Sequence, residues 1–312
     1  MIGEVPEPES PKIVRETMKT RAIIVATDGT TTSTAAVLWA AREAHRRNRP
    51  LRVVHAFDWE FDEARYDIGA EYIDVGRQFA EAVVANAIDQ ARTVAPRIRI
   101  EGDTLIGHAA ARLLAVADSA ELMVLGNRGR GGFTSLLLGS VSRRVATHAP
   151  CPVVIVRGHG HAADGPIAVG VDDSPAAEHV LETSFEAASG RGCGLTVVHA
   201  YLPTIPLWLG DVPAADVDTP DQDADERARL EQLLTPWRSK YPEVPVETML
   251  SRDSAAAVLV GVSHKAQLVI VGSHNHGVIA GTILGSTSIQ LLHHADCPVY
   301  ITRLHHGKEA AR

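Results

Sequence analysis

Several features that mark whole classes of protein are scarce in this 312-residue sequence. Three cysteines are too few for a disulfide framework, and only 4% of the residues are aromatic. No apolar run approaches the ~20 residues of a membrane span, and the acidic, proline-containing residues 3–9 lack the apolar segment of a secretory signal. A net charge of −8 provides no general basic surface for nucleic acid or an anionic membrane. These absences predict a cytoplasmic protein that binds neither nucleic acid nor membrane.

What the sequence does contain is a long internal repeat. The segment Leu51–Phe57 (LRVVHAF) returns as Leu195–Tyr201 (LTVVHAY), 144 residues later. The segment Ala149–Ile155 (APCPVVI) returns as Ala295–Ile301 (ADCPVYI), 146 residues later. Two such similar offsets indicate two copies of a whole domain, each large enough for its own core. We therefore expect a flexible leader over residues 1–20, a first domain over 21–157, a linker over 158–165, a second domain over 166–303 and a tail over 304–312.

Short apolar segments alternate with helix-like segments in both copies. Ala22–Thr27 is too short for a helix and suits a strand buried on both faces, whereas Thr34–Arg47 and Ser140–His148 are typical of helices. This alternation predicts an α/β fold with a parallel sheet and helices on both faces. Cys151 and Cys297 begin equivalent apolar strands, so we expect both to be buried core residues. Ligands of such folds bind beyond the carboxyl ends of the strands, which singles out the segments after the first and fourth strands.

A glycine-rich loop follows the fourth strand of the first copy. It runs from Gly126 to Gly132 and contains Arg128 and Arg130, and Gly139 and Ser140 then open a helix. Glycines let the backbone approach a ligand, and the first N–H groups of a helix favour anions. Together these features predict a polyphosphate cradle, although the sequence lacks the Gly-x-x-x-x-Gly-Lys-Ser/Thr phosphate loop. Taken alone, a Gly-Ser pair is more often a tight turn with a capping serine, and it is the spacing and the strand–loop–helix context that favour the cradle.

The spacing Gly126-x2-Gly129-x9-Gly139-Ser140 resembles the nucleotide-binding signature of ATP-binding universal stress proteins. The resemblance covers both copies, and the chain as a whole is similar to the tandem two-domain universal stress proteins of mycobacteria. It implies two tandem open five-stranded parallel sheets of Rossmann-like type, each holding ATP with Mg²⁺, and it places Asp28 beside the ribose. Asp28 could instead stabilise the turn before the helix. The residues implied for the first site are Ala26, Thr27, Asp28, Ala56, Gly126, Asn127, Arg128, Gly129, Arg130, Gly131, Gly132, Gly139, Ser140, Val141 and Ser142.

The second copy keeps the helix opening but changes the loop. Asn275 replaces Gly129, and His274 and His276 replace the two arginines. Neutral imidazole attracts phosphate less than guanidinium does, so we expect a weaker second site that improves below pH ~6.5. The residues implied for it are Gly170, Val171, Asp172, Ala200, Gly272, Ser273, His274, Asn275, His276, Gly277, Gly285, Ser286, Thr287 and Ser288.

The remaining histidines do not predict a catalytic or metal centre. Several histidines form close pairs in the sequence, such as His293 and His294. No cysteine or carboxylate stands at a familiar metal-ligand spacing from these pairs, so we expect no dedicated metal site. His55 and His199 lie at equivalent positions in apolar strands and are expected to be hydrogen-bonded core residues. Without paired carboxylates or an activated nucleophile, we expect a binding protein and not an enzyme, with at most slow ATP hydrolysis.

The leading hypothesis is thus an ATP-occupied sensor or regulatory module in stress or growth control. Alternatives are a binder of AMP or cyclic AMP with the same fold, an adenylating enzyme of the related α/β class, and an interaction scaffold. The Asp28-Gly29-Thr30-Thr31 turn lacks the Ser-Gly-Gly-type loop of adenylating enzymes. We also expect the last strands, Val153–Arg157 and Val299–Arg303, to pair within the chain, and a homodimer could form through edge strands.

Overall fold

The protein is described by a computed structural model that covers residues 21–57, 70–129, 138–158, 164–203, 219–273 and 284–303. The predicted leader, the tail and most of the linker lie outside these ranges. The first half contains β1 (Ala22–Ala26), α1 (Thr31–Arg47), β2 (Leu51–Phe57), α3 (Ala70–Val94), β3 (Ile100–Ile106), α4 (Ala109–Ala117), β4 (Ala120–Gly126), α5 (Ser140–His148) and β5 (Val153–Val156). The second contains β6 (Ile167–Val171), α6 (Ala177–Ser189), β7 (Leu195–Ala200), α7 (Pro220–Lys240), β8 (Val246–Ser251), α8 (Ala255–Ser263), β9 (Leu268–Val271), α9 (Ser286–His294) and β10 (Val299–Ile301).

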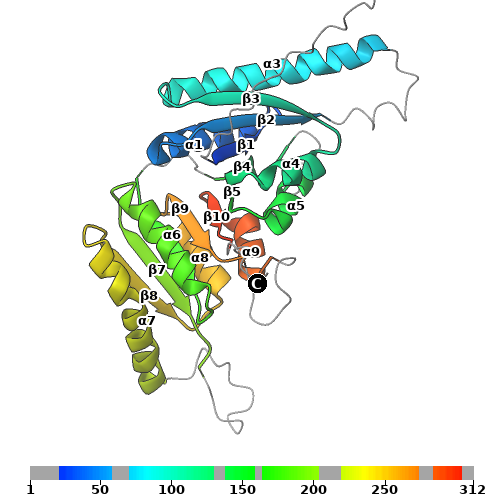
Figure 1. The fold of residues 1–312 in the computed structure, drawn as a ribbon. Helices are drawn as coiled ribbons and strands as arrows, with labels where there is room; N and C mark the ends of the chain where they lie inside the picture. Colours follow the sequence, from blue (N-terminus) through cyan, green and yellow to red (C-terminus); the bar gives the residue numbers. More distant parts are fainter. Residues whose placement is uncertain are drawn as a thin grey trace, which may run out of the picture.

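The described strands form one continuous sheet in the order β3-β2-β1-β4-β5-β10-β9-β6-β7-β8 (Figure 1). Neighbouring strands within each half are parallel, as predicted. The two halves join where β10 pairs antiparallel with β5, with Tyr300 opposite Val154. The expected pairing of the last strands is confirmed. Through this pairing the two predicted five-stranded sheets join into one sheet of ten described strands, because β5 and β10 satisfy each other's edge backbone groups.

Each face of this sheet carries a hydrophobic core that continues through both halves. Helices α1, α3, α6 and α7 pack on one face, and α4, α5, α8 and α9 pack on the other. Side chains alternate between the two cores along each strand, so that Ile23 and Val25 of β1 lie in the first core and Ile24 lies in the second. Cys151 and Cys297 are free thiols buried in the second core, which confirms their expected role.

Two equivalent arginines connect the halves, because each one caps the carboxyl end of a helix in the opposite half. Arg157, after β5, donates from Nη1 to the carbonyl oxygens of Leu291 (3.0 Å) and Leu292 (2.6 Å) in the last turn of α9. Arg303, after β10, donates from Nε to the carbonyl oxygen of Ala149 (3.0 Å) at the end of α5. The last carbonyl groups of a helix carry partial negative charge, so each cation stabilises the helix of the opposite half.

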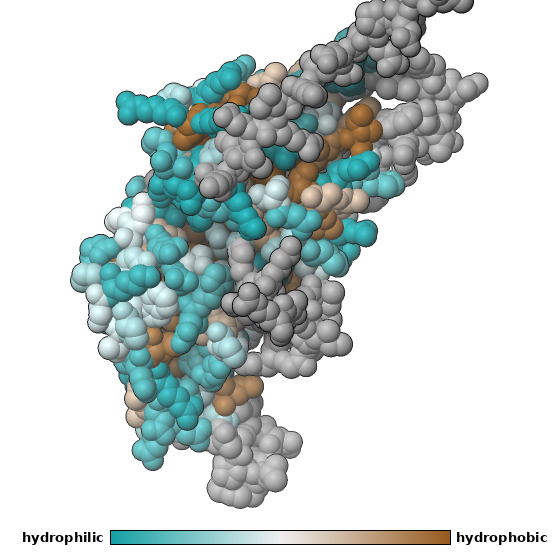
Figure 2. All heavy atoms as spheres, in the orientation of Figure 1, coloured by the Kyte–Doolittle hydropathy of each residue, from teal (hydrophilic) through white to brown (hydrophobic). Residues whose placement is uncertain are grey.

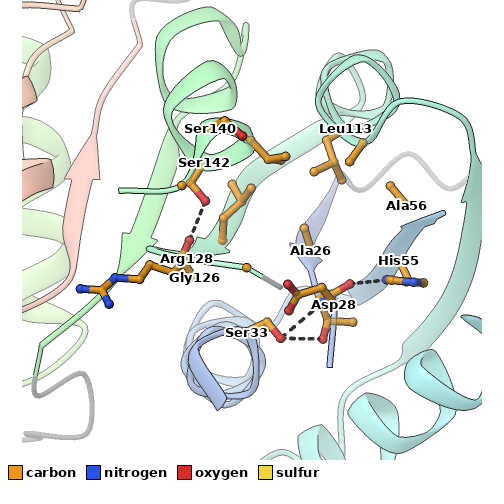
Figure 3. A pocket seen from close by; sticks show the side chains of 16 residues that line it. Ala26, Asp28, Ser33, His55, Ala56, Leu113, Gly126, Arg128, Ser140 and Ser142 are labelled. Carbon is orange, nitrogen blue, oxygen red and sulfur yellow. Dashed lines mark hydrogen bonds between the residues drawn. The ribbon is translucent and has the colours of Figure 1, made fainter. Parts of the chain in front are cut away.

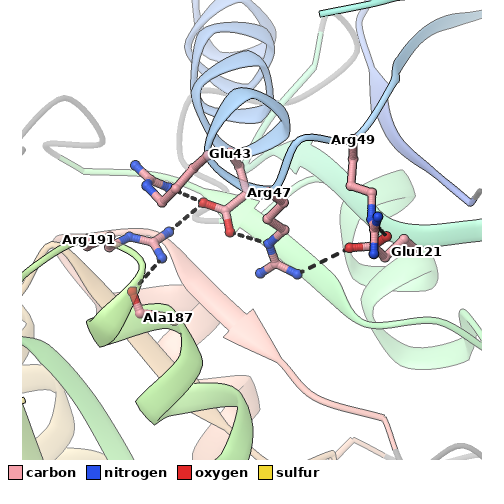
Figure 4. Close-up of polar contacts among 7 residues, drawn as sticks. Glu43, Arg47, Arg49, Glu121, Ala187 and Arg191 are labelled. Carbon is pink, nitrogen blue, oxygen red and sulfur yellow. Dashed lines mark hydrogen bonds and ion pairs between the residues drawn. The ribbon is translucent and has the colours of Figure 1, made fainter. Parts of the chain in front are cut away.

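A buried ion cluster also crosses the junction, on the face covered by α1 and α6 (Figure 4). Glu43 of α1 is 1% exposed and pairs with Arg46 and Arg47 of its own helix. Arg191, from the turn after α6, places Nη2 2.7 Å from Glu43 Oε2. Burial opposes ionisation of Glu43, but the charges of the three arginines outweigh it and hold the pKa of Glu43 below its usual range. The carboxylate is therefore ionised where the two halves meet.

The surface of the molecule is mostly hydrophilic on the face shown in Figure 2. Brown, hydrophobic residues gather in the part where Figure 1 places α3, β3 and α4. Exposed apolar residues of this region include Phe79 on α3 and Ile106 at the end of β3. None of the helices in the described ranges combines the length and the apolar character that a membrane crossing requires.

Candidate functional site

The first half contains a cavity of about 310 Å³ at the carboxyl ends of its central strands (Figure 3). The strand order reverses between β1 and β4. A crevice forms at such a switch point because the chain connections leave it in opposite directions. The volume lies at the lower end of the ~300–1,000 Å³ that is typical of small-molecule sites. The segments predicted to bind a ligand thus border a cavity of suitable size.

Asp28 follows the carboxyl end of β1, and the next turn holds its side chain in place. Its Oδ1 accepts hydrogen bonds from the Thr30 backbone N–H (3.1 Å) and hydroxyl (2.7 Å). The turn-stabilising role that the sequence left open is therefore present. The other carboxylate oxygen, Oδ2, lies so close to Gly129 that a Cβ there would be 2.6 Å away. Asp28 is thus fixed in position against the glycine loop, and Gly129 leaves the space that this contact requires.

The start of α5 forms one wall of the cavity. Gly139 is the N-cap residue and supplies no capping side chain, so the first N–H groups of α5 open toward the crevice. Gly139 itself is held by a hydrogen bond from its N–H to the carbonyl oxygen of Asn127 (2.8 Å). Ser142 donates its hydroxyl to the carbonyl oxygen of Gly126 (2.7 Å), which ties α5 to β4. Of the two serines implied for the first site, Ser142 uses its hydroxyl within the protein, while Ser140 is exposed at the rim of the cavity.

The opposite wall combines one polar ring with small apolar side chains. The buried His55 places Nδ1 2.7 Å from the carbonyl oxygen of Thr27, as expected of a hydrogen-bonded core histidine. Ala26 and Ala56 lie beside it, and α4 contributes Leu113. Such a wall suits a flat, mostly apolar ring system.

Most residues predicted for the first site border the cavity. Ala26, Thr27, Asp28, Ala56, Gly126, Arg128, Gly129, Gly139, Ser140, Val141 and Ser142 line it. Asn127 does not, and Arg130, Gly131 and Gly132 lie outside the described residues. Figure 3 shows the Arg128 side chain extending away from Asp28 and His55. Sequence reasoning did not select Ser33, His55, Ala109, Leu113 and Leu125 as lining residues.

The equivalent crevice of the second half is much smaller, about 90 Å³. Gly170 stands where the first half has Ala26, and Leu259 packs against it so closely that a Cβ on Gly170 would lie 2.7 Å from Leu259 Cδ1. Val180 also lines this crevice and replaces the smaller Ala36. Leu259 is the counterpart of Leu113, which lines the first cavity, so it is not a larger residue; it occupies the space that the missing Cβ of Gly170 leaves.

The residues predicted for the second site divide into three groups. Gly170, Val171, Asp172, Gly272, Gly285, Thr287 and Ser288 line the small crevice, whereas Ala200, Ser273 and Ser286 do not. His274, Asn275, His276 and Gly277 lie outside the described residues. Ser288 donates its hydroxyl to the carbonyl oxygen of Gly272 (3.0 Å), which repeats the Ser142 contact of the first half. The helix–strand tie is thus a structural feature of both copies.

Comparison with known proteins places this architecture in one family. The sequence profile of the universal stress protein family matches residues 19–157 and 165–303. A universal stress protein of Mycobacterium tuberculosis is 34% identical over 301 residues, covering 91% of this chain and 98% of the relative. One of Mycolicibacterium smegmatis is 32% identical over 292 residues, covering 90% and 96%. A solved universal stress protein from Archaeoglobus fulgidus shares the fold, with a TM-score of 0.68 and 18% identity over 92% of this chain and 99% of its own. The chain therefore belongs to the universal stress protein family, with one family domain in each half.

Proposed function

We propose that the first half binds an adenine nucleotide, ATP, and that nucleotide occupancy makes the chain a regulatory module in stress or growth control. The observation that carries this proposal is the ≈ 310 Å³ crevice between a fixed carboxylate and an uncapped helix start. A carboxylate accepts hydrogen bonds from ribose hydroxyls, and a helix N-terminus donates them to phosphate. Asp28 and the first turn of α5 supply these two groups at opposite ends of one cavity.

The residues present fit such a ligand. The apolar wall with Ala26, Ala56 and Leu113 would hold the base, Asp28 the ribose, and Gly139 to Val141 the phosphates. Mg²⁺ would accompany the phosphates and neutralise part of their charge. The second half would bind nucleotide weakly, because its crevice measures only about 90 Å³.

We propose no dedicated catalytic role. Asp28 is the one carboxylate that borders the first cavity within the described parts of the chain, and it lies at the proposed ribose end. His55 directs Nδ1 to the Thr27 carbonyl oxygen. Phosphoryl transfer to water needs a group that orients the water at the terminal phosphate, so we expect any ATP turnover to be far below the ~1 s⁻¹ at the low end of typical enzymes.

The proposal is tested by identifying the ligand that copurifies with the protein. The protein is purified without added nucleotide and denatured, and the released molecules are identified by chromatography and mass spectrometry. Gly139→Glu places a carboxylate at the proposed phosphate site, and Gly285→Glu is the matched change in the second half. Both glycines have extended backbone angles that any residue adopts, φ −71° and −61°. A Cβ on Gly139 would meet no atom closer than 3.5 Å.

We expect ATP from the wild-type protein and from Gly285→Glu, and little or none from Gly139→Glu. If the wild-type protein releases AMP or cyclic AMP and Gly139→Glu does not, the site is supported but its ligand is that nucleotide and not ATP. Absence of any adenine nucleotide even after incubation with ATP, or equal release from both variants, would contradict the proposed site.

A homodimer remains a separate proposal. The strands β5 and β10 are paired with each other inside the chain, so a second chain would have to add at the outer strands, β3 or β8. The β3 strand carries Glu101 and Asp103, and charged residues at a sheet edge oppose strand addition. Light scattering coupled to size-exclusion chromatography measures the oligomeric state.

A further inference from the structure

Three metal-ligating side chains from distant parts of the second half lie together outside both crevices. Asp173 follows β6, His199 belongs to β7, and Glu226 belongs to α7. One ligand atom from each of them lies within 4.8 Å of the others. The sequence did not predict this group, because its members are separated by 26 and 27 residues and no metal motif has that spacing.

The histidine is positioned as a ligand. His199 is 5% exposed, and its ring stacks against Tyr201 with 6.5 Å between ring centres. Its Nδ1 lies 3.2 Å from the carbonyl oxygen of Val171. Because a carbonyl oxygen only accepts hydrogen bonds, Nδ1 carries the proton in this contact, and the lone pair of a neutral ring is then on Nε2. Metal-binding histidines are commonly oriented by such a second hydrogen bond.

The glutamate supplies an oxygen that lacks a donor. Glu226 Oε1 accepts a hydrogen bond from Arg229 Nη1 (2.8 Å). The other oxygen, Oε2, is buried without a hydrogen-bond partner and lies 3.4 Å from His199 Nε2. A buried carboxylate oxygen facing a nitrogen lone pair is unfavourable, because both atoms carry negative charge and neither donates a hydrogen bond. A positive species shared by the two atoms removes this cost.

The exposed Asp173 completes the group on its open side. It borders a cavity of about 470 Å³ together with His199 and Arg229, so an ion can enter from solvent. His199 points to the face of the sheet that carries α6 and α7, since it shares a side with Val197 of the first core. Val198, which borders the nucleotide-type crevice, lies in the core on the opposite face. The cluster is therefore separate from the proposed phosphate positions.

The first half provides an internal comparison. Its equivalent positions, placed by the matching strand registers, hold Gly29, His55 and Ala80. His55 keeps the hydrogen bond from the ring to the strand carbonyl (2.7 Å), so this contact serves the fold in both copies. The two carboxylates are present in the second half alone. Their addition around a shared histidine points to a binding role that the fold itself does not need.

We propose that Asp173, His199 and Glu226 bind a divalent transition-metal ion such as Zn²⁺. One imidazole and two carboxylates are ligands that Zn²⁺ accepts, and a water molecule from the adjoining cavity would complete four-coordination. The second half would then hold a metal ion on one face of the sheet, while the first half holds the nucleotide.

The test is a calorimetric Zn²⁺ titration of the metal-stripped full-length chain, with chelator-buffered Zn²⁺. The variants Asp173→Asn and Glu226→Gln remove ligands while keeping side-chain shape, and Asp173 is exposed, so folding should be retained. His264→Gln removes an exposed histidine that pairs with Asp296 and controls for adventitious binding by the chain's 15 histidines. Ring-nitrogen NMR of His199 gives a second readout, because Zn²⁺ on Nε2 shifts that signal.

We expect one site whose affinity falls about 100-fold in Glu226→Gln, a loss of about 2.7 kcal/mol, and at least about tenfold in Asp173→Asn. His264→Gln should leave that site unchanged, and the His199 Nε2 signal should shift on addition of Zn²⁺. Zn²⁺ binding that is equal in wild type, Asp173→Asn and Glu226→Gln, or an unshifted His199 ring, would overturn the proposal. In that case histidines elsewhere in the chain would account for the bound metal.

Discussion

Replacing Glu43 by glutamine tests how the two halves are held together. The change removes the one negative charge shared by Arg46, Arg47 and Arg191 while keeping the size of the side chain. The side chains of Arg46 and Arg47 are 31% and 27% exposed and can be hydrated after the change. The Arg191 side chain is 6% exposed, so its charge would remain buried without a counter-charge.

Removing one partner of a buried ion pair typically costs about 3–5 kcal/mol, and we expect Glu43→Gln to fall at the lower end, about 3 kcal/mol. The comparison variant is Glu121→Gln at the edge of the same cluster: the Glu121 side chain is 24% exposed, pairs with Arg49 and lies 3.7 Å from Arg47 Nη1. Its partners, Arg47 and Arg49, are 27% and 42% exposed and can be hydrated, so we expect a loss of about 1 kcal/mol. Urea unfolding followed by far-ultraviolet circular dichroism and by tryptophan fluorescence measures both variants.

The pH dependence of the free energy of unfolding provides a second check, and its direction is fixed by the lowered pKa of Glu43. Because the pKa of Glu43 is lowered in the folded protein, its contribution to the free energy of unfolding is present above the unfolded value of about 4.5 and is lost as the pH falls through the folded pKa. The stability difference between wild type and Glu43→Gln should therefore shrink in acid. A loss below about 1 kcal/mol at pH 7, equal to that of Glu121→Gln, would refute the idea that the cluster couples the halves.

Two further predictions concern the glycines and the thiols. Gly192→Ala should cost about 1–2 kcal/mol, because φ is +62° and a Cβ there meets nothing within 4 Å, so only the left-handed backbone is penalised. Gly158 has a similar φ of +56°, but a Cβ on it would lie 1.8 Å from the Asp296 carbonyl oxygen. Gly158→Ala should therefore lower the free energy of unfolding in urea clearly more than Gly192→Ala does. Equal losses would contradict the close contact between Gly158 and Asp296. Burial raises the pKa of all three thiols, to about 11 for Cys151 and about 12 for Cys297, but Cys193 is only half-buried and so stays accessible to a reagent. Cys193 should thus react first when the native protein is labelled with a thiol reagent and digested for mass spectrometry, and faster labelling of either buried thiol would contradict the described packing.

Local pattern was sufficient to predict most of the fold. The helix Ser140–His148 has the predicted bounds, because the Gly-Ser opening and the apolar strands around it are unambiguous. The first helix was predicted from Thr34 but begins at Thr31. Thr30 is its N-cap residue, and its hydroxyl accepts a hydrogen bond from the Ser33 N–H (3.3 Å), so the cap lies earlier in the Thr-rich turn than expected. Several hydroxyl residues in a row leave the choice of cap to local geometry.

Contacts between distant residues could not be predicted in the same way. The volume of the second crevice depends on how closely α8 packs on β6, where Leu259 occupies the space that a Cβ on Gly170 would need. Sequence reasoning expected weaker nucleotide binding there for another reason, the loss of loop arginines. Likewise, Glu226 meets His199 only because α7 packs beside β7 and β8. Tertiary packing, and not local propensity, determines both features.

We propose that nucleotide binds tightly in the first half and weakly in the second, and the most direct test is the stoichiometry of ATP binding. Calorimetric titration with Mg²⁺-ATP should give one tight equivalent per chain. Gly129→Ala would place a Cβ 2.6 Å from Asp28 Oδ2 and should weaken that binding at least about tenfold. As a control in the second half, Gly272→Ala, at the counterpart of Gly126, would place a Cβ at an ordinary 3.5 Å from Val180 and should leave the tight equivalent unchanged. Two equivalents of similar affinity, or equal losses in the two variants, would contradict the account.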